Sequence, residues 1–126
     1  MSRADIAESA ALVVGTSGGI GEAVLRYYLA QPALEHIYAY SRSHCPTQLL
    51  SHGDRLHWTT GDYSESSIAQ CVESLSGYDG HLQRVVICNG VLHGEQFSPE
   101  KSIDRVSTAA MMEVFHANVV VPSLWL

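Results

Sequence analysis

The 126-residue sequence has little positive charge and no long hydrophobic run. Its 7 lysines and arginines are outnumbered by 13 aspartates and glutamates, and they form no basic cluster of the kind that binds duplex nucleic acid. No apolar run approaches the length of a membrane span. Charged residues at positions 3, 5 and 8 interrupt the hydrophobic region that a signal peptide needs. We therefore expect a soluble protein with no nucleic-acid or membrane partner.

Cysteine is also scarce. The 3 cysteines, at positions 45, 71 and 88, form no Cys-x-x-Cys pair, and their odd number argues against a disulfide framework. This favours a reducing compartment, the cytoplasm. The 7 histidines form no His-Glu-x-x-His group, so we predict no metal site.

Apolar residues, in contrast, make up 46% of the chain, and charged residues make up 16%, which is enough apolar material for the core of one domain. Short apolar segments predict buried strands at 10–15, 36–40, 56–60 and 84–88. Between these strands, helical periodicity predicts one helix that begins at residue 20 and ends at Pro32 and another over 64–76. We also expect a short helix at 48–50 and a last helix over 107–126. This alternation predicts an α/β fold, a Rossmann-type doubly wound parallel sheet in strand order 3-2-1-4.

The same periodicity predicts which helix residues reach the core. The residues that recur at three- and four-residue steps are Ile20, Val24, Tyr27 and Tyr28 in the first helix and Ile68, Cys71, Val72 and Leu75 in the second. Met111 and Met112 of the last helix are also expected in the core.

The predicted fold does not look finished at its last helix. Residues 119–126 are apolar, with no glycine or asparagine stop and no basic residue in the final turn. The strand at 84–88 would also form an apolar sheet edge, which proteins normally cover. We therefore expect residues 1–126 to be the N-terminal portion of a single Rossmann-type domain.

A glycine-rich turn, Gly15-x-x-x-Gly19-x-Gly21, lies between the first predicted strand and the first predicted helix. In such a motif Gly15 allows the sharp turn, Gly19 lets the backbone approach a pyrophosphate, and Gly21 allows close helix–strand packing. The free N–H groups at the start of the helix favour an anion. A glycine-rich turn without a ligand is the alternative, but the spacing and the strand–helix context favour nucleotide binding.

Residues 14–21, Val-Gly-Thr-Ser-Gly-Gly-Ile-Gly, resemble the Thr-Gly-x-x-x-Gly-Ile-Gly signature of short-chain dehydrogenases/reductases, with Val14 in place of threonine. The resemblance covers essentially the whole chain. It adds Ser17, Gly18 and Ile20 to the expected cofactor-binding turn. Residues 90–93, Gly-Val-Leu-His, and the short length also resemble the C-factor-like members of that family.

The choice between NAD and NADP depends on the end of the second strand. A carboxylate about 20 residues past the glycine motif would bind the ribose of NAD. Ser41 stands there instead, followed by Arg42, whose guanidinium suits the 2′-phosphate of NADP. The sequence therefore favours NADP over NAD, with a solvated surface arginine as the alternative. Gly18 departs from the basic residue that many NADP-using members carry before the second motif glycine.

Two further segments match the family. Asp62, with Tyr63 beside it, matches the aspartate that binds the adenine amino group, although a carboxylate favoured by a helix N-terminus is an alternative. Asn89 and Gly90 align with the end of the family's Asn-Asn-Ala-Gly stretch, with Asn89 at the alanine position. Cys88 takes an asparagine position, and we interpret it as a small buried hydrophobe.

Asn118 aligns with the family asparagine of the long interface helix, and the resemblance gives it a catalytic role. In the family this residue distorts the helix and holds a water of the proton relay. Its alternative is a helix-face asparagine that meets solvent or another subunit. The same helix implies a homodimer or homotetramer in the complete protein.

The resemblance implies hydride transfer between NADP(H) and a small carbonyl or alcohol substrate. The family's Tyr-x-x-x-Lys is missing, since Lys101 is the only lysine and residue 97 is Phe97. We therefore expect this stretch alone to be inactive. The alternative is a non-catalytic, nucleotide-binding signalling or sensor protein of the same fold.

Overall fold

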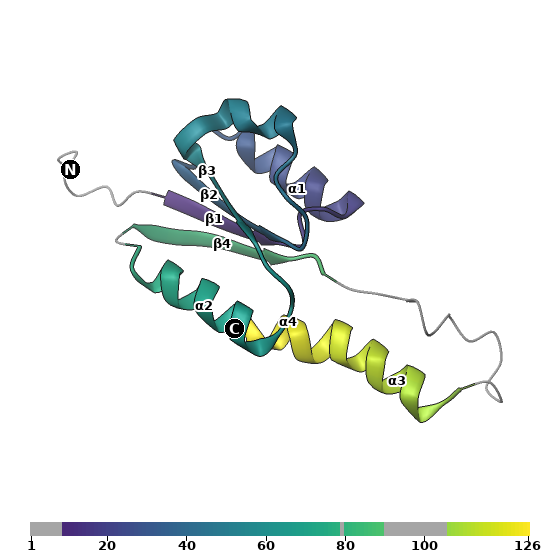
Figure 1. Ribbon diagram of the computed structural model, residues 1–126. Coiled ribbons are helices and arrows are strands. Elements are labelled where there is room, and N and C mark those ends of the chain that lie inside the picture. Colours follow the sequence, from purple (N-terminus) through teal and green to yellow (C-terminus); the bar gives the residue numbers. More distant parts are fainter. Residues whose placement is uncertain (1–8, 79, 90–105) are drawn as a thin grey trace.

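The computed structural model describes residues 9–78, 80–89 and 106–126. Four strands form one sheet: β1 (Ser9–Val14), β2 (His36–Ser41), β3 (Leu56–Thr60) and β4 (His81–Ile87). All neighbouring strands are parallel, and their order is β3-β2-β1-β4 (Figure 1). The predicted fold class and strand order are therefore confirmed, with β4 beginning three residues before the predicted strand.

Helices cover both faces of the sheet. One face carries α1 (Gly19–Leu29) and the 3₁₀ helix η2 (Thr47–Arg55), which is longer than the predicted helix at 48–50. The other face carries α2 (Glu65–Ser76) and the last helix (Figure 1). The last helix consists of α3 (Thr108–Phe115), the π-helical turn η4 (His116–Val120) and α4 (Val121–Leu124).

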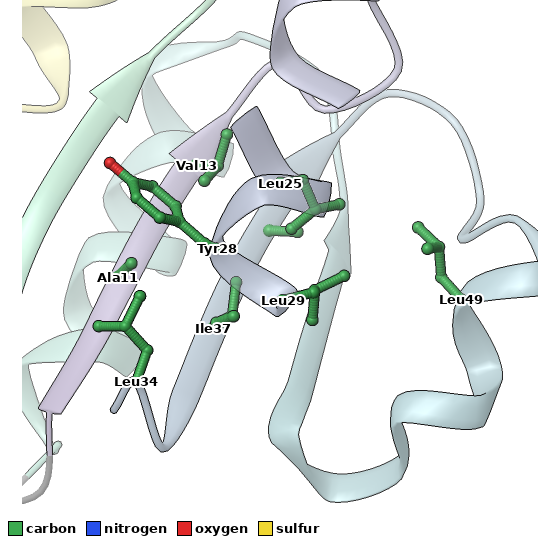
Figure 2. Close-up of a cluster of buried hydrophobic side chains, with 9 residues drawn as sticks. Ala11, Val13, Leu25, Tyr28, Leu29, Leu34, Ile37 and Leu49 are labelled. Atoms are coloured by element: carbon green, nitrogen blue, oxygen red, sulfur yellow. The ribbon is translucent and has the colours of Figure 1, made fainter. Parts of the chain in front are cut away.

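Every residue of β1 is buried, because its side chains alternate between two cores. Ala11 and Val13 face α1 and pack with Leu25, Leu29 and Ile37 (Figure 2). On the opposite face, the side chains that pack together include Leu12 and Val14 of β1, Ile68 and Cys71 of α2, and Val121 and Trp125 near the end of the chain. Each large side chain buried in this way contributes about 1.5–3 kcal/mol to folding. The predicted burial of the first strand on both faces is confirmed.

The predicted core face of α1 is right for Tyr28, which is buried, and for Val24, which is half-buried against the core, but wrong for Ile20 and Tyr27. The buried residues are Gly21, Leu25, Tyr28 and Leu29. Ile20 and Tyr27 are instead 76% and 63% exposed. The cause is at Gly21, where the backbone of the helix lies against the Gly15 carbonyl. This contact sets the rotation of the helix, and the residues that follow Gly21 by four, seven and eight positions then face the sheet.

Two further core predictions need correction. Ile68 and Cys71 are buried and Leu75 is half-buried as expected, but Val72 is exposed. Met111 and Met112 are 44% and 67% exposed, and α3 has no buried residue. The last helix reaches the core only near its end, through Val121 and Trp125, so its first turns lie beyond the part of the sheet that is described.

Arg55, the last residue of η2, holds the C-terminal end of α1. Its guanidinium Nε donates to the Leu34 carbonyl at 2.9 Å. Its terminal nitrogens donate to the carbonyls of Tyr28, Leu29 and Gln31. The last carbonyls of a helix have no partner within the helix and carry its negative dipole end. Arg55 therefore ties α1 to the start of β3 and helps to fix the helix on the sheet.

We predict that Arg55→Met lowers the free energy of unfolding by about 2–4 kcal/mol, because it removes several charge-assisted hydrogen bonds and leaves the carbonyls without these donors. Urea denaturation of the variant checks this. Arg26→Met is the matched control, since Arg26 forms an exposed ion pair with Glu22 at 2.8 Å, and we expect a change of about 0.5 kcal/mol or less. Equal effects of the two substitutions would contradict the role given to Arg55.

Candidate functional site

The glycine turn lies at the carboxyl end of the sheet, bonded to the strands on both sides. The Gly15 amide donates to the Tyr40 carbonyl of β2 at 2.8 Å, and the Cys88 amide after β4 donates to the Val14 carbonyl at 2.8 Å. Gly15 has a φ of +85°, a left-handed conformation that favours glycine. A Cβ at this position would lie 2.8 Å from the backbone nitrogen of Asn89. The chain therefore turns sharply at Gly15, as the motif predicts.

The other two motif glycines differ in what requires them. A Cβ on Gly21 would overlap the carbonyl oxygen of Gly15, so this glycine is needed for helix–strand packing. A Cβ on Gly19 would meet nothing within 4 Å. No contact within the described chain explains a glycine at position 19, whereas a ligand that lies against the backbone would explain it.

The start of α1 also differs from the starts of α2 and α3. Gly18 precedes α1 and provides no side-chain cap. The side chain of Ser64 caps α2 at the Ser67 amide, and that of Ser107 caps α3 at the Ala110 amide. The first amides of α1 thus have no side-chain acceptor. They lie at the positive end of the helix dipole, a place that favours an anion.

A cavity of about 480 Å³ opens beside this turn. Its lining combines the glycine turn with the chain that follows β2, β3 and β4 and with the π turn of the last helix. The lining residues are Gly15, Ser17, Gly18, Arg42, Asp62, Tyr63, Ser64, Cys88, Asn89, His116, Ala117 and Val121. Because the strands lie in the order β3-β2-β1-β4, Arg42 and Asn89 follow the strands on opposite sides of the glycine turn.

The structure brings most of the predicted cofactor residues together around this cavity. Exceptions are Gly19, Ile20, Gly21 and Ser41, which do not line it. Gly21 is buried beneath the turn, and Ser41 is fully buried, with its Oγ accepting from the Ser43 amide at 3.1 Å. Ser41 therefore shapes the chain that carries Arg42. Gly90 lies outside the described residues.

Several lining residues were missed by the sequence analysis, namely Ser64, His116, Ala117 and Val121. The last three belong to η4 and the turn after it. A π turn holds more residues than an α-helical turn, so an ordinary helical period gives the wrong face there. Cys88, interpreted as a buried hydrophobe, is half-buried at the cavity wall, and desolvation by burial raises the pKa of its thiol.

Asp62 lines the cavity and also orders the approach to α2. Its Oδ1 accepts from the Ser64 amide at 3.0 Å and from the Ser64 hydroxyl at 2.5 Å. These hydrogen bonds lower the pKa of the Asp62 carboxyl, so it is ionised at neutral pH. The Tyr40 hydroxyl donates to the Asp62 carbonyl at 2.5 Å, which fixes the backbone of this segment to β2.

Arg42 brings a positive charge to the cavity wall. Its guanidinium lies 5.6 Å from the centre of the Tyr63 ring, within the range of a cation–π contact. Within the described residues it has no ion-pair partner. An exposed guanidinium without a carboxylate beside it is available to bind an anionic group of a ligand.

The last helix is distorted at Asn118. This residue lies inside the π turn η4, and its side chain is exposed rather than part of the cavity lining. The adjacent Ala117 carbonyl accepts a hydrogen bond from Nδ2 of Asn89 at 3.4 Å. The turn is thus connected to the end of β4, on the side of the cavity away from Arg42.

Comparison with known proteins finds no matching family model. An uncharacterized oxidoreductase of Saccharomyces cerevisiae is 26% identical over 110 residues, which are 85% of this chain and 41% of that protein. Its crystal structure, described as a short-chain dehydrogenase/reductase, matches with a TM-score of 0.74 at 21% identity, over 94% of this chain and 46% of that one.

Two other solved structures agree with this match. The KRED1-Pglu enzyme is 26% identical with a TM-score of 0.74, over 93% of this chain and 48% of that one. A short-chain dehydrogenase from Streptomyces avermitilis is 18% identical with a TM-score of 0.72, over 94% of this chain and 42% of that one. The resemblance to short-chain dehydrogenases/reductases is confirmed, and the chain spans about half the length of the relatives it matches. The finer resemblance to C-factor-like members stays a prediction.

In the described part of the chain, no helix combines the length and apolar character needed to cross a membrane. Across residues 9–78, 80–89 and 106–126, no three or more His, Cys, Asp or Glu side chains gather in a way that could hold a metal ion.

We predict that Gly21→Ala lowers the free energy of unfolding by about 3 kcal/mol or more, because the added methyl overlaps the Gly15 backbone, which cannot move without breaking its bond to β2. Gly19→Ala should change it by about 1 kcal/mol or less, since its methyl meets open space. Thermal and urea denaturation of both variants check this. Gly77→Ala, at the end of α2, is the control for an ordinary glycine, with its nearest contact at 3.6 Å. Similar losses for Gly19→Ala and Gly21→Ala would contradict the distinction.

Proposed function

We propose that residues 1–126 form the dinucleotide-binding portion of a single Rossmann domain in a short-chain oxidoreductase. The cofactor is a nicotinamide dinucleotide, NADP(H) in preference to NAD(H). The reaction is hydride transfer between this cofactor and a small carbonyl or alcohol substrate. The observation that carries the proposal is the cavity at the carboxyl end of the sheet, which Gly15, Ser17 and Gly18 line next to the uncapped start of α1. Gly19, the first residue of that helix, has open space where a Cβ would stand.

The residues around the cavity suit the parts of such a cofactor. The backbone of Ser17 and Gly18 and the start of α1 would bind the diphosphate. Arg42 would bind the 2′-phosphate of NADP, and the ionised Asp62 would accept from the adenine amino group. Tyr63, which lies beneath the Arg42 guanidinium, would add an aromatic surface on the adenosine side.

The contribution of this chain to the reaction is binding and orientation. The bound nicotinamide would supply or accept the hydride. The 126 residues contain no Tyr-x-x-x-Lys to move the proton, because Lys101 is the only lysine and Phe97 stands four residues before it. By resemblance, Asn118 in the π turn would support the proton relay. We therefore propose that this stretch alone does not catalyse the reaction.

The exposed side of the last helix supports a homodimer or homotetramer of the complete protein. Met112, Phe115 and Val119 are 67%, 57% and 51% exposed there, which is unusual for apolar side chains of this size unless another surface covers them. The free thiols of Cys45, Cys71 and Cys88 favour a reducing compartment, and we propose the cytoplasm.

A non-catalytic, nucleotide-binding sensor of the same fold is the second candidate. It rests on the same cavity and glycine turn, which would bind a nucleotide with or without a reaction. The two candidates share the nucleotide site and differ only in turnover, so an assay of carbonyl reduction by the complete gene product separates them.

We predict that the protein binds NADPH more tightly than NADH, as followed by nicotinamide fluorescence during titration. Arg42→Ala should weaken NADPH binding by about tenfold or more and leave NADH binding nearly unchanged, because only NADPH carries the phosphate. Arg26→Ala, on the exposed side of α1, should change neither affinity. A folded protein that binds neither nucleotide would overturn the proposed function, and an equal loss of both nucleotides in Arg42→Ala would contradict only the preference for NADP.

A further inference from the structure

Asn89 carries a polar atom that the described chain leaves without a partner. Its Nδ2 donates to the Ala117 carbonyl at 3.4 Å, but its Oδ1 is buried and has no hydrogen-bond partner among the described residues. Buried polar atoms in proteins are nearly always hydrogen-bonded, so such an acceptor needs an explanation. The Trp125 Nε1, the other buried unpaired side-chain atom described, belongs to a residue of the hydrophobic core, whereas Asn89 lines the cavity.

The position of Asn89 indicates which part of a dinucleotide it would meet. Its backbone nitrogen is the nearest atom to the place where a Cβ on Gly15 would stand, so Asn89 adjoins the glycine turn. It follows β4, whereas Arg42 follows β2, and β1 lies between these strands. A dinucleotide whose diphosphate rests on the turn extends one nucleoside to each side of it. Asn89 would therefore face the nucleoside opposite to the one that Arg42 binds.

We infer that Oδ1 of Asn89 accepts a hydrogen bond from a ribose hydroxyl of that second nucleoside, the one that carries the nicotinamide. This inference rests on the proposed function. An amide oxygen can only accept, and this half of the ligand offers two kinds of neutral donor, the ribose hydroxyls and the nicotinamide carboxamide. The hydroxyls lie nearer the diphosphate, and Asn89 adjoins the turn on which the diphosphate would rest. The resemblance gives no reason to expect this contact, because its Asn-Asn-Ala-Gly stretch has alanine, which has no polar side chain, at this position.

The Nδ2 group of the same amide connects Asn89 to the last helix. Nδ2 is directed to the carbonyl of Ala117, inside the π turn that also contains Asn118. One side chain would thus join the bound ribose to the distorted turn of the last helix. Asn89 is therefore a positioning residue, which aligns the nicotinamide half of the ligand with that turn.

The test compares two ligands in wild-type protein and in Asn89→Ala. NADPH contains both nucleosides, whereas 2′,5′-ADP contains only the adenosine half. We expect Asn89→Ala to weaken NADPH binding by about tenfold and to leave 2′,5′-ADP binding unchanged, measured by isothermal titration calorimetry. The variant should unfold at a urea concentration close to that of wild type, because the substitution removes an unpaired buried acceptor together with one long hydrogen bond, from Nδ2 to the Ala117 carbonyl at 3.4 Å.

Other outcomes would overturn the inference. Unchanged NADPH affinity in Asn89→Ala would show that Oδ1 makes no useful contact. An equal loss for NADPH and 2′,5′-ADP would show that the residue acts through the fold of the cavity. Failure of folded wild-type protein to bind either ligand would instead overturn the proposed function, and the role of Asn89 with it.

Discussion

The contact between the backbones of Gly15 and Gly21 is the constraint on which the candidate site depends. Two residues without side chains allow the start of α1 to lie directly against the turn that leaves β1. This contact sets the rotation of the helix, and it brings Leu25, Tyr28 and Leu29 onto the sheet. It also places Ser17 and Gly18 of the turn between them at the cavity. A side chain at either position would push the helix away from the strand and disrupt the turn.

The remaining parts of the cavity follow from the sheet. Parallel strands end at one edge, so the residues that follow β2, β3 and β4 come together around the turn although they are far apart in sequence. The polar groups are unevenly placed. Arg42 and Asp62 follow the strands on one side of β1, and Asn89 follows the strand on the other. This asymmetry matches a ligand with two different ends, and it underlies both the proposed preference for NADP and the role proposed for Asn89.

The sequence predicted the sheet well because its signals are local. Apolar runs bounded by glycine and proline identify buried strands, and glycine spacing identifies the turn. The face of α1 was predicted for only half of its residues, because Ile20 and Tyr27 fit the helical period as well as Leu25 does, and only the tertiary contact at Gly21 decides between them. His116 and Ala117 were missed for a related reason, since no local signal marks the extra residue of a π turn. Arg55 was also not predicted, because its acceptors are more than 20 residues away in the chain.

The central claim is that the main chain of the glycine-rich turn, residues 15–21, holds the diphosphate of a dinucleotide. The most direct test is the NADPH affinity of Gly19→Ala, because the structure gives its methyl no contact within the described protein. The account predicts a protein that is as stable as wild type and binds NADPH at least about 100-fold more weakly, since the methyl would occupy the space of the phosphates. Wild-type affinity in this variant would contradict the account.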